Sequence, residues 1–226
     1  MDAQNNFTQL GEVRDSGDPG LAELYEKNND FVGWLKINGT RVDYPVMQTP
    51  DNPEYYLHRD FDKKDSVSGT PFLDAGSVVS GPGKTWNWFI YGHNMKFGTM
   101  FHDLMKYENK AFWKKHSTFT FDTYSPGQAG NHSQGTANAG TTEVEYEIVA
   151  AAYSKIRSKD STKFKYYQYY SYTDEQTFNE FVAGIKAESL YDTGITPEYG
   201  DQLVTLSTCA YQTTNGRFYI VGRRIK

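Results

Sequence analysis

The feature of this sequence that most restricts its fold is the repetition of short runs rich in aromatic and β-branched residues. Glycine-containing or polar segments separate these runs, which include residues 86–91, 118–123, 144–153, 202–209 and 217–222. Aromatic residues make up 16% of the 226 residues, and aromatic and β-branched side chains favour strands over helices. The pattern predicts about eight short strands, arranged as a barrel or a sandwich with helices inserted between strands.

The segments between the runs predict the remaining elements. Apolar spacing predicts helices over about 19–35, with a break near Asn28, over 53–60 and 99–115, and from Thr173 to about 190. A hairpin is predicted around the turn dipeptide Asn38-Gly39. Residues 1–18 are polar and aperiodic and predict a disordered tail, and the glycine-rich residues 125–142 predict a long loop. We therefore expect a single domain over 19–226.

Charge and hydropathy argue against several classes of function. The chain has 23 Lys and Arg against 28 Asp and Glu, a net charge of −5, so we expect no general attraction to nucleic acid or anionic lipid. No apolar run approaches the roughly 18 residues of a membrane span. Residues 1–6 lack the regions of a signal peptide, which leaves a cytoplasmic protein or a chain that starts downstream of its targeting segment. We expect the chain as given to be soluble.

The single cysteine, Cys209, cannot form an internal disulfide. It is either a small buried apolar residue, an exposed thiol or a reactive one. A reactive cysteine needs a histidine or a positive charge beside it, because a free thiol is mostly protonated at neutral pH. Arg217 lies eight residues further on, across a loop predicted to join two antiparallel strands. Cys209 also ends a strand at the mouth of the fold, and both features favour a nucleophile.

Among the histidines, His93 is the best candidate for a partner of the cysteine. It follows an aromatic strand, and Gly92 gives backbone freedom where the strand becomes a loop. The other histidines lie among charged residues or in the flexible loop, where solvation explains them: His58, His102, His116 and His132.

Metal and nucleotide sites find little support in the sequence. No spacing matches a zinc motif, a P-loop, a dinucleotide fingerprint or a serine-hydrolase elbow. Two acidic groups could be lined up as ligands, but each is most simply a solvated face: Asp60, Asp62 and Asp65, and Glu143, Glu145 and Glu147. We therefore expect no metal and no cofactor.

The combined motif resembles the sortases, the cysteine transpeptidases of Gram-positive bacteria. It consists of Thr205-Leu206-Ser207-Thr208-Cys209 on one strand, Arg217 opening the next, and Tyr91-Gly92-His93 far upstream. The serine in this motif, the helical N-terminal segment and the helix before the cysteine strand resemble class B, over about residue 20 to the end. The resemblance implies a mainly β fold with α insertions: an eight-stranded closed β-barrel with N-terminal helices and a helix inserted before the cysteine strand.

The resemblance also implies an activity and its residues. Cys209, His93 and Arg217 would be catalytic, joining secreted proteins that bear a C-terminal sorting signal of the Asn-Pro-x-Thr type to a peptidoglycan amine outside the cell. An anchor helix absent from this chain would be the only link to the membrane. Candidates for binding the substrate are Ser207 and Thr208, beside the nucleophile, and Asn52 and Leu57, in a segment that matches the family. Two alternatives stay open: a cysteine peptidase that hydrolyses the same intermediate, and a surface-binding barrel in which Cys209 is structural.

Overall fold

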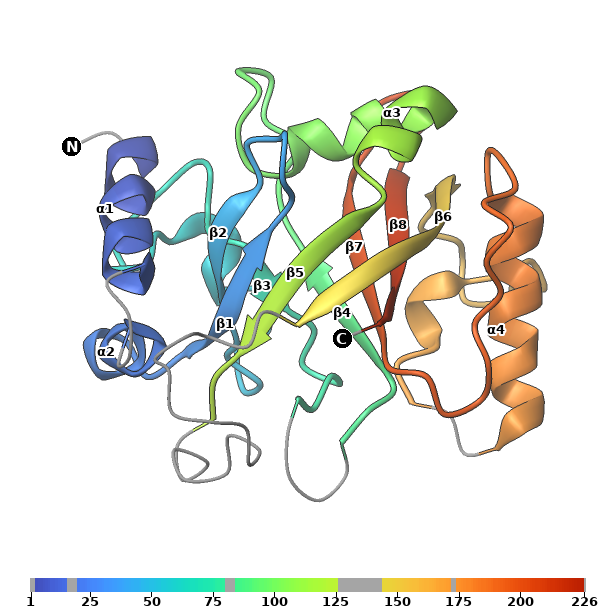
Figure 1. Ribbon diagram of the computed structural model, residues 1–226, viewed down its shortest axis with the longest axis horizontal. Helices are drawn as coiled ribbons and strands as arrows, with labels where there is room; N and C mark the ends of the chain where they lie inside the picture. Colours follow the sequence, from blue (N-terminus) through green and yellow to red (C-terminus); the bar gives the residue numbers. More distant parts are fainter. Residues whose placement is uncertain (1–2, 16–19, 80–83, 126–143, 172–173, 226) are drawn as a thin grey trace.

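The protein is built around a closed β-barrel (Figure 1). The structure, a computed structural model, describes residues 3–15, 20–79, 84–125, 144–171 and 174–225. The strands in this part of the chain are β1 (Phe31–Lys36), β2 (Asp43–Met47), β3 (Phe72–Leu73), β4 (Asn87–Tyr91), β5 (Thr118–Thr123), β6 (Glu145–Lys155), β7 (Leu203–Cys209) and β8 (Gly216–Arg224). Their order around the barrel is β1-β2-β3-β4-β7-β8-β6-β5, and pairing of β5 with β1 closes it. The predicted eight-stranded barrel is confirmed.

Helices cover the outside of the barrel and connect its strands. They are α1 (Ala3–Asp15), α2 (Gly20–Lys27), the 3₁₀ helices η1 (Tyr55–His58), η2 (Phe101–Glu108) and η3 (Tyr166–Gln168), α3 (Lys110–Lys115) and α4 (Glu175–Glu188). Figure 1 shows α1 and α2 on one side of the barrel and α4 on the opposite side. The predicted helices over 53–60 and 99–115 and the helix inserted before the cysteine strand are therefore confirmed.

The predicted disordered tail is wrong for residues 3–15, which form α1. Phe7 and Leu10 are buried, and the Phe7 ring packs edge-on against Tyr44, with ring centroids 5.3 Å apart. Arg14, in the last turn of the helix, places its guanidinium over the Trp34 ring and forms an ion pair with Asp43 at 2.7 Å. These long-range contacts stabilise a helix whose polar, glycine-containing sequence gives little local signal. Residues 1–2 and 16–18 of the predicted tail lie outside the described residues.

The predicted helical segment over 19–35 is wrong in its second half. The helix ends at Lys27, and residues from Phe31 onward form β1. The chain leaves the helix at Asn28, whose buried side chain donates hydrogen bonds to the Tyr56 hydroxyl and the Phe61 carbonyl. The hairpin predicted around Asn38-Gly39 is confirmed, since β1 pairs antiparallel with β2 and Gly39 has a positive φ of 79°.

The start of α4 and the loop before β6 were also predicted from the sequence. The N-cap of α4 is Asp174, whose carboxylate accepts a hydrogen bond from the backbone N–H of Thr177 at 2.7 Å, and not the predicted Thr173, which lies outside the described residues. The loop predicted over 125–142 lies outside them as well, except for Ser125.

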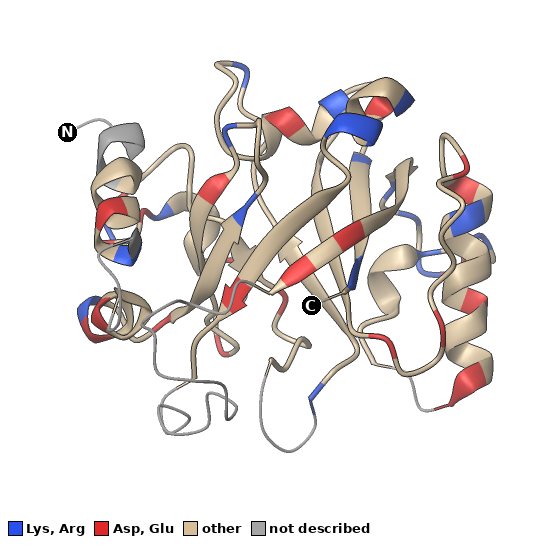
Figure 2. Cartoon of the chain, viewed as in Figure 1, with Lys and Arg blue, Asp and Glu red and all other residues tan. Residues whose placement is uncertain are grey.

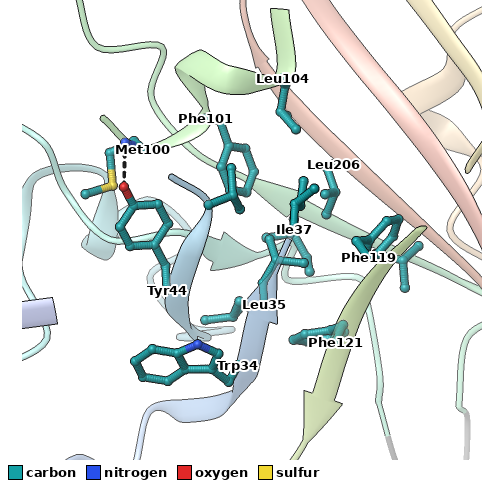
Figure 3. Packing of buried hydrophobic residues seen from close by; sticks show 14 of the residues in the cluster. Trp34, Leu35, Ile37, Tyr44, Met100, Phe101, Leu104, Phe119, Phe121 and Leu206 are labelled. Atoms are coloured by element: carbon teal, nitrogen blue, oxygen red, sulfur yellow. Dashed lines mark hydrogen bonds between the residues drawn. The ribbon is translucent and has the colours of Figure 1, made fainter. Parts of the chain in front are cut away.

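The barrel interior is filled by alternate residues of its strands (Figure 3). In β5, Phe119 and Phe121 are buried while the threonines between and beside them are half-buried, as expected of a strand with one face in the core. Phe121 packs edge-on against Trp88 of β4, with ring centroids 6.0 Å apart. Near one end of the barrel, the Tyr44 hydroxyl accepts a hydrogen bond from the backbone N–H of Met100. These buried side chains therefore form one continuous core, against which the strands pack.

Phe121→Ala should destabilise the protein by about 3–5 kcal/mol, because it leaves a cavity in a fully buried position. Urea or guanidinium unfolding followed by fluorescence measures the change. Thr120→Ala on the other face of β5 is the control, with an expected loss under about 1 kcal/mol. Equal losses in the two variants would contradict this account of the core.

Candidate active site

The three residues predicted to be catalytic lie on neighbouring strand ends. β7 lies between β4 and β8 in the barrel. The antiparallel pairing of β7 with β8 sets Cys209 directly opposite Arg217, at a Cα separation of about 4.5–5.5 Å. The parallel pairing of β4 with β7 sets Tyr91 opposite Ser207, and just before His93 the carbonyl of Gly92 accepts a hydrogen bond from the Thr208 hydroxyl.

The pairing of β7 with β8 gives two of these side chains a common direction. Residues directly opposite each other on paired strands share a face of the sheet, so Cys209 and Arg217 lie side by side. His93 lies two residues beyond the end of β4 and lines the same cavity as both. The predicted return of Arg217 beside Cys209 is confirmed by the pairing of their strands.

One local contact of His93 indicates the tautomer of its neutral ring. Its Nε2 lies 2.9 Å from the backbone carbonyl oxygen of Leu57. A carbonyl oxygen only accepts hydrogen bonds, so Nε2 carries a proton. In the neutral ring Nδ1 then holds the lone pair, and Nδ1 is the nitrogen that can exchange a proton with a reacting group. The His58 ring lies beside it, with ring centroids 5.8 Å apart.

A cavity of about 430 Å³ collects most of the predicted site residues. Its lining includes Leu57, His93, Ser207, Thr208, Cys209 and Arg217. Cys209 and Arg217 are half-buried there, and one guanidinium nitrogen of Arg217 donates to the carbonyl of Gly216 at 2.9 Å. The cavity thus brings a thiol, an imidazole and a permanent positive charge to one opening.

Asn52 is the predicted site residue that does not belong to this lining. It is exposed, and its backbone forms a turn with Thr49 and Tyr55. Its carbonyl also accepts a hydrogen bond from the Thr49 hydroxyl at 2.8 Å. These contacts explain Asn52 as a turn residue that precedes η1.

Ser207 and Thr208 already have partners for their hydroxyls. The Ser207 Oγ lies 2.7 Å from the Tyr166 hydroxyl, and the Thr208 hydroxyl donates to the carbonyl of Gly92 at 2.7 Å. Both residues are at most 2% exposed. Their contribution to substrate binding stays a prediction, and their observed contacts connect β7 to its neighbours.

Tyr91 and Asp74 also line the cavity, and the sequence reasoning missed them. The Tyr91 hydroxyl donates to the Asp74 carboxylate at 3.2 Å. Burial, and then the negative charge of Asp74, raise the pKa of Tyr91 far above its ordinary value, so this phenol stays neutral. Tyr91 ends β4 two residues before His93, and this closeness in sequence could have identified it. Asp74 has no comparable signal.

A second missed group, Tyr166 and Tyr167, forms the wall contributed by the segment between β6 and α4. The Tyr166 ring stacks on Tyr219, with centroids 4.1 Å apart. The Tyr219 hydroxyl donates to Glu188 of α4 at 3.0 Å, and Glu188 also forms an ion pair with Arg157 at 3.2 Å. Burial raises the pKa of Tyr166, while its hydrogen bond with Ser207 and the charge of Arg217 act in the opposite direction. The inserted helix thus supports one wall of the cavity.

Three of the acidic residues considered above as metal ligands pair with basic residues: Asp65 with Arg59, Asp62 with Lys64, and Glu147 with Arg223. Glu143 lies outside the described residues. Figure 2 shows both acidic and basic residues along α4. Within the described ranges, no group of three or more His, Cys, Asp or Glu is placed to hold a metal ion.

Among the described residues, no helix combines the length and the apolar character that crossing a bilayer requires.

Comparisons with known proteins identify the family of this chain. The family model for the sortase domain matches residues 35–225. Sortase B of Listeria monocytogenes is 33% identical over 217 residues, which cover 95% of this chain and 76% of the relative. The structure of a Staphylococcus aureus sortase B–substrate complex has a TM-score of 0.75 at 25% identity and covers 99% of this chain and 93% of its own. A sortase B structure complexed with triglycine has a TM-score of 0.76 at 26% identity, covering 99% and 94%.

The family match covers most of the chain, including every strand from β2 to β8. The curated relative and the solved structures are both described as sortase B. The chain therefore belongs to the sortase family of cysteine transpeptidases, and within that family to class B.

Proposed function

We propose that this sortase cleaves a C-terminal sorting signal of the Asn-Pro-x-Thr type in secreted proteins and transfers the new acyl group to a peptidoglycan amine. The observation that carries the proposal is that one cavity is lined by His93, Cys209 and Arg217, with Cys209 and Arg217 opposite each other on paired strands. Because such substrates meet outside the cell, the proposal includes the outer face of the cell membrane as its location.

In the first half of the reaction, Nδ1 of His93 takes the proton of the Cys209 thiol, and the resulting thiolate attacks the threonine carbonyl of the signal. The carbonyl oxygen gains negative charge in the tetrahedral intermediate, and the guanidinium of Arg217 stabilises it. The C–N bond then breaks, and the leaving amine takes a proton from His93. The products are an acyl-thioester on Cys209 and the released C-terminal fragment.

In the second half, an amine of the cell wall attacks the thioester. His93 accepts a proton from the attacking nitrogen, the C–S bond breaks, and Cys209 leaves as the thiolate. The product is a new amide bond between the secreted protein and the acceptor. The sortase B structures described with a substrate and with triglycine support a peptide donor and a glycine amine as acceptor.

The experiment that tests the proposal is cleavage of fluorogenic Asn-Pro-x-Thr peptides with and without triglycine, with the products identified by mass spectrometry. We expect triglycine to be captured in the acyl product, while a matched peptide with valine in place of threonine is cleaved much more slowly. Hydrolysis without capture would instead identify a cysteine peptidase. No cleavage of any peptide, together with no labelling of Cys209 by a thiol-reactive probe, would support the binding barrel.

A further inference from the structure

The loop that carries His93 is fastened to the cysteine strand on both sides of the histidine. On one side, the Thr208 hydroxyl donates to the carbonyl of Gly92 at 2.7 Å. On the other side, the side-chain amide of Asn94 donates to the carbonyl of Cys209 at 2.9 Å. Gly92 also packs closely against Phe101, and glycine is required there because a Cβ would lie 2.7 Å from the Phe101 ring. The backbone of His93 is therefore bracketed by contacts to β7.

Asn94 is held in one orientation by its other partners. Its Nδ2 donates to the Cys209 carbonyl, so its Oδ1 is the acceptor for His102 Nδ1, 2.8 Å away. Its own backbone carbonyl accepts a hydrogen bond from the Tyr211 hydroxyl at 3.1 Å. Asn94 is 7% exposed, so these bonds lie largely out of water, where a lost partner is costly.

We propose that Asn94 is a positioning residue that sets the location of the His93 imidazole relative to the Cys209 thiol. The inference rests on the proposed function, because it takes His93 and Cys209 as the reacting pair. Asn94 is not part of the cavity lining, and its effect passes through its neighbour in the chain. Its hydrogen bond ends on the backbone carbonyl of the nucleophile itself, so one side chain connects the residue after His93 directly to Cys209.

The expected effect follows from the geometry of proton transfer. A general acid or base must lie about 2.6–3.2 Å from the atom with which it exchanges a proton. A misplacement of about 1 Å can lower the rate by about 10²-fold. Loss of the Asn94 side-chain bond removes the direct link between this side of the His93 loop and Cys209, while Thr208 still holds the other side. We expect kcat to fall by about 10- to 100-fold and KM to change by less than about threefold, since the substrate cavity keeps its lining.

The test compares Asn94→Ala with Asn28→Ala in the full chain, by peptide cleavage kinetics and thermal unfolding. Asn28 is a matched control, because it is 5% exposed and its amide also donates to two partners, the Tyr56 hydroxyl and the Phe61 carbonyl. Both variants should lower the unfolding temperature, but only Asn94→Ala should lower kcat. Asn94→Asp serves as the second variant, because it keeps the shape and replaces the donor with a carboxylate oxygen; it should lower kcat by at least about tenfold.

Several outcomes would overturn the inference. They are equal kcat losses in Asn94→Ala and Asn28→Ala, a rise in KM with kcat unchanged, or wild-type kcat in Asn94→Asp. His93→Ala and Cys209→Ala are measured in parallel to separate this inference from the proposed function. Wild-type turnover in those two variants would contradict the proposed function, whereas their inactivity beside an unaffected Asn94→Asp would contradict the positioning role alone.

Discussion

Replacing Cys209 with alanine should abolish both cleavage of the peptide and its transfer to triglycine. The proposed reaction passes through a thioester on this sulfur, and no other cysteine exists in the sequence to replace it. Removal of a catalytic nucleophile can lower kcat by about 10⁶-fold, which places Cys209→Ala at the background rate. The unfolding temperature should stay close to that of the wild type, because the half-buried Cys209 ends a strand and its backbone contacts to Asn94 and Arg217 remain possible.

Mass spectrometry provides the second measurement for this variant. The wild-type chain incubated with peptide and no amine should gain the mass of the acyl group, and Cys209→Ala should not. Thr205→Val, which removes a hydroxyl bonded to Asn87 at the other end of β7, is the control and should still form the adduct. Cleavage by Cys209→Ala at more than about one-hundredth of the wild-type rate would contradict the assigned nucleophile.

Replacing Arg217 with alanine should lower kcat by about 10²- to 10³-fold without unfolding the protein. Removing one donor from a developing oxyanion typically has an effect of this size. The side chain contributes little to the fold, since its guanidinium donates to the carbonyl of the adjacent Gly216. Arg217→Lys should recover only part of the rate, because an ammonium group keeps the charge but lacks the planar, forked set of donors.

Arg223 on the same strand supplies the matched control for this prediction. It lies at the opposite end of β8 and pairs with Glu147 and Asp201. Arg223→Ala should lower stability modestly, by up to about 1 kcal/mol for a partly exposed pair, and leave kcat unchanged. Steady-state kinetics and thermal unfolding of both variants give the comparison. If Arg217→Ala retained the kcat of Arg223→Ala, the oxyanion role would belong to another group.

The strands and the proximity of Cys209 to Arg217 could be predicted because their signals are local. Phe119 and Phe121 alternate with threonines, which is enough to predict β5 and its buried face. Cys209 and Arg217 lie on two successive strands, so their proximity follows from a single turn. His93 needed more, since it lies two residues beyond β4 and reaches the same cavity only in the folded barrel.

The missed features depend on contacts between distant parts of the chain. α1 is stabilised by Phe7 against Tyr44 and by Arg14 against Asp43, and none of these pairs is visible in a short window. The segment beginning at Phe31 has apolar spacing that also fits a helix, but its pairing with β2 and β5 makes it a strand. Asp74 and Tyr166 reach the cavity from separate loops, so their approach to Cys209 required the three-dimensional arrangement.

The position of β7 and β8 in the barrel has a consequence for how this enzyme becomes active. These strands come later in the chain than the other six, yet they fill the gap between β4 and β6. Before they are inserted, the nucleophile and Arg217 are absent from the site, and the sheet has two unpaired edges where the core is open. Pairing β4 with β7 closes a loop of more than about a hundred residues, a non-local step of the kind that slows folding. A partly synthesised or partly folded chain therefore has no functional thiol pocket, and acyl transfer begins only when barrel closure is complete.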